Sequence, residues 1–511
     1  MDSEQEKRAD TTAKAGWIAF VAAALLWLAP TSQSLWIDEG SMGLLSREST
    51  VSGLRTALGQ IAGSEALMPL TALYFWTVEK FVGDGEWALR CGNLPWLWLG
   101  IICLALIGRR IGWPWLPLLF AVHPVVWFYA DEIRPYAIQL GAGCWLALGF
   151  VQVVQSEGKS VTGLWNLGLA AAVVSTASFL GVFVVAAAGV VLILKAVVAH
   201  WVPTRRQLGV IGFLGAVNLA FLIIMLSRLM GGAGGSKSWT VGISNLGFAL
   251  YELLGLSGLG PGREALRATA VTGGLSGTVH LLLPYFGVQS ALLLLYGALF
   301  CTAIYLTRKG RDSSVFQLAI LSGWVAVLSV VGLFIASLVM KFPFWGRHLA
   351  PMLPFLLVAV GAAASLLSTA GSSRRSGLLL FPLFALLLFS SLEIRFNPQQ
   401  GKDDYRSATA LALAEVAQGK RVCWIASRQP GQFYHLTFST TWPPAPGTAS
   451  IAIPVPGVDP APDLLFVSKL DLFDRGGRGR ALIRSYPMPP KEVGLSFLVY
   501  GYPAPSGASP Q

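Results

Sequence analysis

The acidic pair in the segment SLWIDEGSM is the first feature of the sequence that could do chemistry. Asp38 and Glu39 come a few residues after an apolar stretch, where a loop would meet the lipid headgroups. A carboxylate in this place can take a proton from an acceptor hydroxyl group, so both are candidate catalytic residues and Asp38 is the candidate base. The alternative is a polar loop that helps to end the preceding helix, because loops accept acidic residues freely.

A second charged group lies in the segment VVWFYADEIRPYAIQL. Asp131, Glu132 and Arg134 fall between two apolar stretches, with Tyr136 close behind them. Charges at the edge of a bilayer are costly unless they are solvated or paired, which makes these four residues candidates for substrate binding. The alternative is a capped helical hairpin whose aromatic residues anchor it at the membrane interface.

A third charged group, in KFPFWGRHLAPMLP, contains Lys341, Arg347 and His348. An arginine can hold a phosphate through two parallel hydrogen bonds, and a protonated histidine adds another donor. The segment is therefore a candidate site for an anionic ligand. The alternative is that these side chains start a helix and reach toward the headgroups.

Further charged residues mark the segments SRLM and GLGPGREALR. Arg263 lies here together with Arg228, Glu264 and Arg267. They could line a cleft, with Arg263 as a substrate-binding residue, or rest on anionic lipid.

The elements that must position these residues are membrane-spanning helices. Of the 511 residues, 54% are hydrophobic and 12% are charged, which is about half the charged fraction of a soluble globular chain. Apolar stretches of about 20 residues, enough to cross a bilayer, recur along the chain. We expect about eleven spans, at 16–31, 89–107, 113–129, 133–154, 161–178, 179–198, 210–226, 288–306, 315–340, 349–367 and 377–392.

The distribution of basic residues predicts the orientation of these spans. With a cytoplasmic N-terminus, every inner loop is basic, as the positive-inside rule requires; the inner residues are Lys7, Arg8, Lys14, Arg109, Arg110, Lys159, Arg205, Arg206, Arg308, Lys309, Arg311, Arg374 and Arg375. Topology thus explains the formal net charge of +11. Since these residues form no continuous stripe or tail, we expect no nucleic-acid partner.

This topology predicts two domains. Residues 1–392 would form a transmembrane module with amphipathic outer helices in 32–88 and a second outer loop at 229–287. The polar tail, 393–511, alternates helix-like and strand-like patterns and predicts a small periplasmic α/β domain. We expect neither a disulfide framework nor a thiolate metal site, because four of the five cysteines lie in or beside apolar segments.

One arrangement uses all three outer charged groups: a site that accepts a lipid-linked phosphate and moves the group attached to it. Polyprenyl phosphate is a fair leaving group once arginine and histidine neutralise it, so a single carboxylate base suffices. A glycosidase would need two opposed carboxyl groups. No spaced ligand set demands a metal, and we expect no cofactor.

Several phrases, taken in order, resemble the GT-C superfamily of polytopic glycosyltransferases, in particular protein O-mannosyltransferases, aminoarabinose transferases and RgtA/B/C/D-like proteins. The matching phrases are WIDEG, GDGEWALR with Arg90, ADEIRPYA, RHLAPMLP and KDDYRSATALA. Many relatives carry His-Pro-Pro in the first outer loop, where this chain has Met68, Pro69 and Leu70.

The resemblance implies an inverting glycosyltransferase of the bacterial inner membrane. A polyprenyl-phosphate-linked sugar would be the donor, and a glycolipid, a polysaccharide or a protein the acceptor. Asp38 would be the base, and Arg347, His348, Lys341 and Arg90 would bind the donor phosphate. The alternatives are a ligase or polymerase of lipid-linked oligosaccharides, a transporter or flippase, and an assembly subunit with a degenerate site.

Overall fold

A computed structural model of the protein describes residues 2–60, 63–231, 241–308, 313–369, 373–474, 476–486 and 489–501. The chain forms two compact units, and each is built from separated segments. The first consists of Met1–Thr31, Arg55–Tyr74 and Leu89–Gln400. The second consists of Ser32–Leu54, Phe75–Ala88 and Gly401–Gln511. The segment 32–88, expected within the membrane module, therefore contributes to both units.

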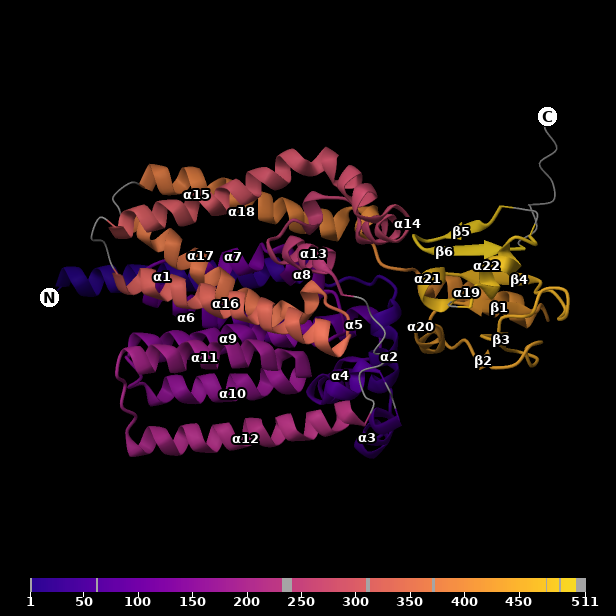
Figure 1. Ribbon diagram of the computed structural model, residues 1–511, viewed down its shortest axis with the longest axis horizontal. Helices are drawn as coiled ribbons and strands as arrows, with labels where there is room; N and C mark the ends of the chain where they lie inside the picture. The colour runs from indigo at the N-terminus through magenta and orange to yellow at the C-terminus, as the bar shows by residue number, and fades with distance from the viewer. Residues whose placement is uncertain are drawn as a thin grey trace. The chain divides into compact units, whose positions relative to one another are not determined.

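The first unit is a bundle of long apolar helices (Figure 1). In the described part of the chain, eight helices are long and apolar enough to cross a membrane, and two more apolar helices are shorter. The long elements are α1 (Asp2–Leu25), α6 (Leu94–Ile111), α9 (Tyr136–Gln155), α10 (Val161–Ala177), α11 (Val182–Val198), α12 (Arg205–Met230), α14 (Arg263–Leu282), α15 (Phe286–Arg308), α16 (Ser313–Met340), α17 (Leu353–Thr369) and α18 (Ser373–Phe396). The predicted all-α polytopic architecture is confirmed.

The expected span 113–129 is not a single helix. It consists of two short helices, α7 (Leu116–Ala121) and α8 (Pro124–Ala130). Proline at position 124 has no N–H group to continue the helix before it, so it begins a new one. His123 caps this new helix by accepting a hydrogen bond from the Val125 N–H at 3.3 Å.

Small residues let the central helix α9 approach its neighbours closely. A Cβ atom on Gly141 would lie 2.1 Å from the Trp96 carbonyl oxygen of α6, and one on Gly143 would lie 2.6 Å from the Pro351 carbonyl oxygen. Close backbone approach is the usual basis of helix packing in membranes. It fixes Tyr136, the first residue of α9, relative to the turn that precedes α17.

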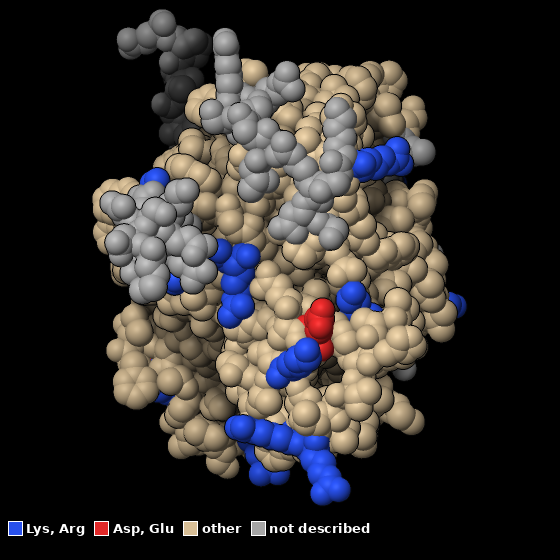
Figure 2. Space-filling view, turned by 90° about the vertical axis from the view of Figure 1, so that its left-hand side faces the viewer, with Lys and Arg blue, Asp and Glu red and all other residues tan. Residues whose placement is uncertain are grey.

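Basic residues collect at one end of the helical unit. Figure 2 shows this face, where lysine and arginine side chains greatly exceed acidic ones. Helices α6, α11 and α15 end, and α12 begins, with Arg109, Arg110, Lys195, Arg308, Arg205 and Arg206. Because α6 has 18 residues, it separates Arg109 from the opposite end of the bundle by roughly 27 Å.

Short elements connect the long helices. They are α3 (Val51–Gln60), η2 (Ser64–Leu67), α4 (Pro69–Val82), α5 (Glu86–Cys91), α13 (Ile243–Leu253) and η6 (Gly346–Met352). Among the candidate site residues, Arg90 lies in α5, and Arg347 and His348 lie in η6.

The second unit contains a six-stranded sheet with the order β2-β3-β1-β4-β6-β5. Its strands are β1 (Val422–Ile425), β2 (Phe438–Ser439), β3 (Ala449–Ser450), β4 (Leu464–Val467), β5 (Lys491–Val493) and β6 (Phe497–Tyr500). β1 to β4 are parallel to one another, whereas β6 is antiparallel to β4 and β5. The sequences VCWI and LLFV are fully buried strands, as continuous apolar runs predict for a parallel sheet.

Helices complete the second unit: α2 (Ile37–Ser46), α19 (Tyr405–Ala417), α20 (Arg428–Phe433), α21 (Leu470–Phe473) and α22 (Arg478–Ile483). Asp404 caps α19 by accepting a hydrogen bond from the Ser407 N–H at 3.0 Å. The rings of Tyr405, Trp424 and Phe497 pack together in the core. The predicted small α/β region in the tail is confirmed.

Candidate functional site

In the helical unit, the predicted residues Arg90 and Asp131 belong to a buried network of hydrogen bonds and ion pairs. Arg90 is fully buried, and its Nε lies 3.5 Å from the Asp131 carboxylate. The same carboxylate accepts hydrogen bonds from the backbone N–H and the hydroxyl of Thr31, at 2.6 and 3.1 Å. Asn93 donates to the carbonyl oxygens of Ala130 and Glu132. These contacts tie the start of α6 to the α8–α9 loop.

Arg134 from the same loop forms a second buried pair. Its Nη1 lies 2.7 Å from the Glu65 carboxylate, and its Nη2 donates to the Ser64 hydroxyl. The pair holds the turn η2 to the start of α9. Arg90, Asp131 and Arg134 therefore each contact other residues of the same unit. Their roles in binding substrate or phosphate stay predictions.

The Tyr129 hydroxyl brings four predicted residues together. Arg263, Glu132, Tyr136 and Arg347 all interact with it electrostatically. The Tyr129 and Tyr136 rings lie 4.8 Å apart. Residues separated by more than 200 positions in the sequence thus lie within electrostatic range of one buried group.

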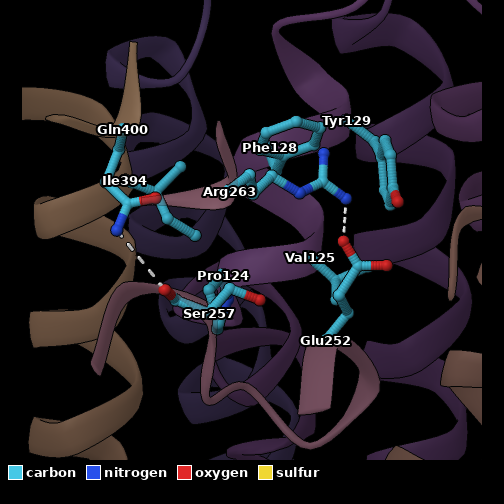
Figure 3. A pocket seen from close by; sticks show the side chains of 9 residues that line it. All are labelled: Pro124, Val125, Phe128, Tyr129, Glu252, Ser257, Arg263, Ile394 and Gln400. Carbon is cyan, nitrogen blue, oxygen red and sulfur yellow. Dashed lines mark hydrogen bonds and ion pairs between the residues drawn. The ribbon is translucent and has the colours of Figure 1, made fainter. Parts of the chain in front are cut away.

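Tyr129 also lines a small pocket that is partly open to solvent. Figure 3 shows the guanidinium of Arg263 reaching Glu252, with which it forms an ion pair, beside the ring of Phe128. The Arg263 Cζ lies 3.9 Å from the centre of that ring. Pro124, Val125 and Ile394 add apolar walls. An arginine oriented by a carboxylate and an aromatic ring, in a partly apolar pocket, suits an amphiphilic anion.

The third predicted group lies in the turn η6 and just before it. Arg347 and His348 are partly buried, and Lys341 is exposed. The Arg347 guanidinium lies 5.7 Å from the centre of the Trp345 ring. Lys341 has a φ of 55°, a left-handed backbone conformation that is uncommon for residues other than glycine. The chain turns sharply here between α16 and η6.

Asp38 and Glu39 lie in the second unit, in the first turn of α2. Glu39 is fully buried and accepts a hydrogen bond from the Trp36 N–H at 3.4 Å. Lys402 lies 3.4 Å from the same carboxylate. Asp38 is partly exposed, so of the two acids it is the one that solvent or substrate can reach.

Further charged residues of the second unit gather near this pair. Lys469, with a side chain that is 5% exposed, lies 2.8 Å from the Asp403 carboxylate. Its ammonium group lies 5.3 Å from the centre of the Trp36 ring. Burial raises the pKa of Tyr405, and the negative charges of Asp403 and Asp38 raise it further. The positive charges of the nearly buried Lys402 and Lys469 therefore compensate the negative charges of Glu39 and Asp403.

Sequence reasoning missed Glu252, Lys402 and Lys469 as members of these clusters. Lys402 and Lys469 lie far along the chain from the acids that they pair with. Glu252 is a single acidic residue in a mostly apolar helix, 11 residues before Arg263. One signal was available for Lys402, because it opens the phrase KDDYR. Among the described residues, no group of three histidine, cysteine or acidic side chains is placed to hold a metal ion.

Comparison with known proteins relates the chain to others by fold. The sequence matches no protein-family model and no curated protein. The structure matches that of ArnT from Cupriavidus metallidurans in the apo state, with a TM-score of 0.53 and 14% identity over 95% of this chain and 97% of that one. ArnT bound to undecaprenyl phosphate gives a TM-score of 0.50 and 14% identity, over 95% and 98% of the two chains.

A weaker match is the oligosaccharyltransferase of Archaeoglobus fulgidus in the apo form, with a TM-score of 0.46 and 11% identity over 86% of this chain and 64% of that one. The match to ArnT extends over nearly the whole of both chains and includes the helical unit and the small α/β unit. The protein is thus a polytopic helical membrane protein with the fold seen in ArnT.

Proposed function

We propose that this protein is a membrane glycosyltransferase. It transfers a sugar from a polyprenyl-phosphate donor to a glycolipid, polysaccharide or protein acceptor. The fold supports this proposal, since the similar ArnT has been crystallised with undecaprenyl phosphate. A fold alone does not determine a function, so the assignment depends on the residues of the site.

The observation that carries the proposal is the set of charges around the Tyr129 pocket. Arg263 lines the pocket with Tyr129 and pairs with Glu252, and Glu252 lies against Gly346, the residue before Arg347. Guanidinium groups match the geometry of a phosphate, and the apolar walls suit the first carbons of a prenyl chain. We assign donor-phosphate binding to Arg263 and Arg347, together with the predicted His348 and Lys341.

Asp38 is the proposed base. The acceptor oxygen loses its proton to the Asp38 carboxylate and forms a bond to the anomeric carbon of the sugar. The bond from that carbon to the phosphate oxygen breaks, and polyprenyl phosphate leaves with the electron pair. One displacement of this kind inverts the anomeric configuration. Arginine stabilises the charge that develops on the leaving phosphate.

The proposed orientation has a cytoplasmic N-terminus and places the reaction at the outer face of the inner membrane. The basic residues at one end of the helical unit (Figure 2) support this orientation, because cytoplasmic loops carry an excess of lysine and arginine. The pocket residue Tyr129 lies two residues before Asp131, which pairs with Arg90 just before α6, whereas Arg109 is in the last turn of that helix.

Sugar transfer in membranes tests the proposal. Membranes from cells that express the wild type, Asp38→Asn or Arg347→Ala are compared by mass spectrometry of glycolipids and surface polymers. We expect both variants to lose transfer of one sugar by about 100- to 10,000-fold at unchanged protein levels. Asp84→Asn, which changes an exposed carboxylate paired with Arg47, is the matched control.

Unchanged products in the Asp38→Asn strain would remove the proposed base. They would favour a transporter, a flippase or an assembly subunit, none of which needs a proton acceptor at this position. Transfer of an oligosaccharide in place of a single sugar would identify a ligase or polymerase instead.

A further inference from the structure

Glu252 lines the pocket beside Arg263 and also contacts the segment that carries Arg347. It lies in the last turn of α13, is 3% exposed, and pairs with Arg263. Its other oxygen faces Gly346, where a Cβ atom would lie only 2.3 Å from Oε2. The next residue in the chain is Arg347. The negative charge of Glu252 is therefore held beside Arg263 and beside the segment that carries Arg347.

Packing alone does not account for this carboxylate. Among the described residues, neither Glu252 Oε2 nor the Tyr129 hydroxyl has a hydrogen-bond partner, although both residues are buried. A buried charged oxygen without a hydrogen bond is costly, and a neutral side chain of the same size would avoid the cost. Buried ionisable groups of this kind, placed in a pocket, concentrate at functional sites.

We infer that Glu252 sets the charge that the pocket accepts, so that the pocket favours a lipid phosphodiester over the corresponding phosphomonoester. This inference rests on the proposed function. The sugar donor is a phosphodiester and carries one negative charge. When the sugar leaves, the lipid keeps a phosphomonoester, whose charge at neutral pH lies between about −1.5 and −2.

The physical reason is the balance of charge around the bound phosphate. Glu252 cancels one unit of the positive charge that Arg263 and Arg347 supply, and it repels the additional negative charge of the product. Its effect is strong because the carboxylate is buried, where water screens it poorly. Glu252 thus weakens product binding more than donor binding and promotes release of the lipid phosphate.

Binding of two lipids to the purified full-length protein tests this inference. The probes are undecaprenyl phosphate and its methyl phosphodiester, measured in detergent at pH 8, where the monoester is a dianion. We expect Glu252→Gln to strengthen binding of the monoester about ten-fold more than binding of the diester. Glu264→Gln removes a more exposed acid that pairs with Arg267, and we expect it to keep the wild-type ratio.

Gly346→Ala supplies a second variant, because its new methyl group must displace the Glu252 carboxylate. We expect the same direction of change, with thermal unfolding as the control for correct folding. A folded Glu252→Gln protein with the wild-type ratio would overturn the inference and leave the proposed function intact. A wild-type protein that binds neither lipid would instead overturn the proposed function.

Discussion

At the scale of single residues, the predicted ionisable groups differ in how far substrate can reach them. Arg90 and Glu39 are fully buried, whereas Arg347 and Asp38 are partly exposed. In a buried ion pair, each charge is already compensated by its partner, and removing one partner leaves an uncompensated charge. Burial therefore favours positioning roles for Arg90 and Glu39.

Glu39→Ala tests this distinction in the second unit. We expect it to lower the free energy of unfolding by about 3 kcal/mol, because the Lys402 ammonium, with a 7% exposed side chain, would lose its carboxylate. The measurement is thermal and denaturant unfolding of the full-length protein in detergent. In a double-mutant cycle with Lys402→Ala, the two costs should be far from additive. Additive costs would show that the pair is not coupled.

At the scale of elements, the position of α2 depends on one close contact. A Cβ atom on Gly40 would lie 2.4 Å from the backbone nitrogen of Pro430 in α20. The glycine lets the two helices touch, and Asp38 lies one turn or less from this contact. The site on α2 is thus set by helix packing within the second unit.

We expect Gly40→Ala to reduce sugar transfer at least about ten-fold, because the methyl group must push α2 away from α20 and displace the Asp38 side chain. Gly59→Ala in α3 is the matched control, since nothing lies within 4 Å of a Cβ at that position. Transfer assays and thermal unfolding of both variants provide the comparison. Wild-type transfer in Gly40→Ala would mean that α2 tolerates the shift.

At the scale of the whole molecule, orientation in the membrane follows from the basic end of the helical unit. Single cysteines can report it in a protein whose five native cysteines are replaced. We expect a membrane-impermeant maleimide to label Val458→Cys on intact spheroplasts, and Lys159→Cys only after permeabilisation. Both native side chains are well exposed. Labelling of Lys159→Cys from outside would reverse the proposed topology.

Hydropathy and the positions of the basic residues predict much of the architecture from the sequence. A long apolar helix satisfies its own backbone hydrogen bonds, so its composition predicts it without knowledge of its neighbours. The α/β tail was also predictable, because VCWI and LLFV are short, continuous apolar runs of the kind that favours buried strands. The break at Pro124 was also visible in the sequence, but a length criterion alone merged α7 and α8 into one span.

The surroundings of the charged residues could be decided only from the tertiary structure. Asp38 and Arg347 stood out because charge beside apolar stretches is unusual in any context. Glu252 gave no such signal, because its role depends on its contacts with Arg263 and Gly346. These contacts leave no local pattern in the sequence. The sequence by itself determined a polytopic helical protein with charged groups at the ends of its spans. Only the tertiary structure decided which charges are buried with partners and which remain open to a ligand, because burial and pairing depend on packing between distant parts of the chain.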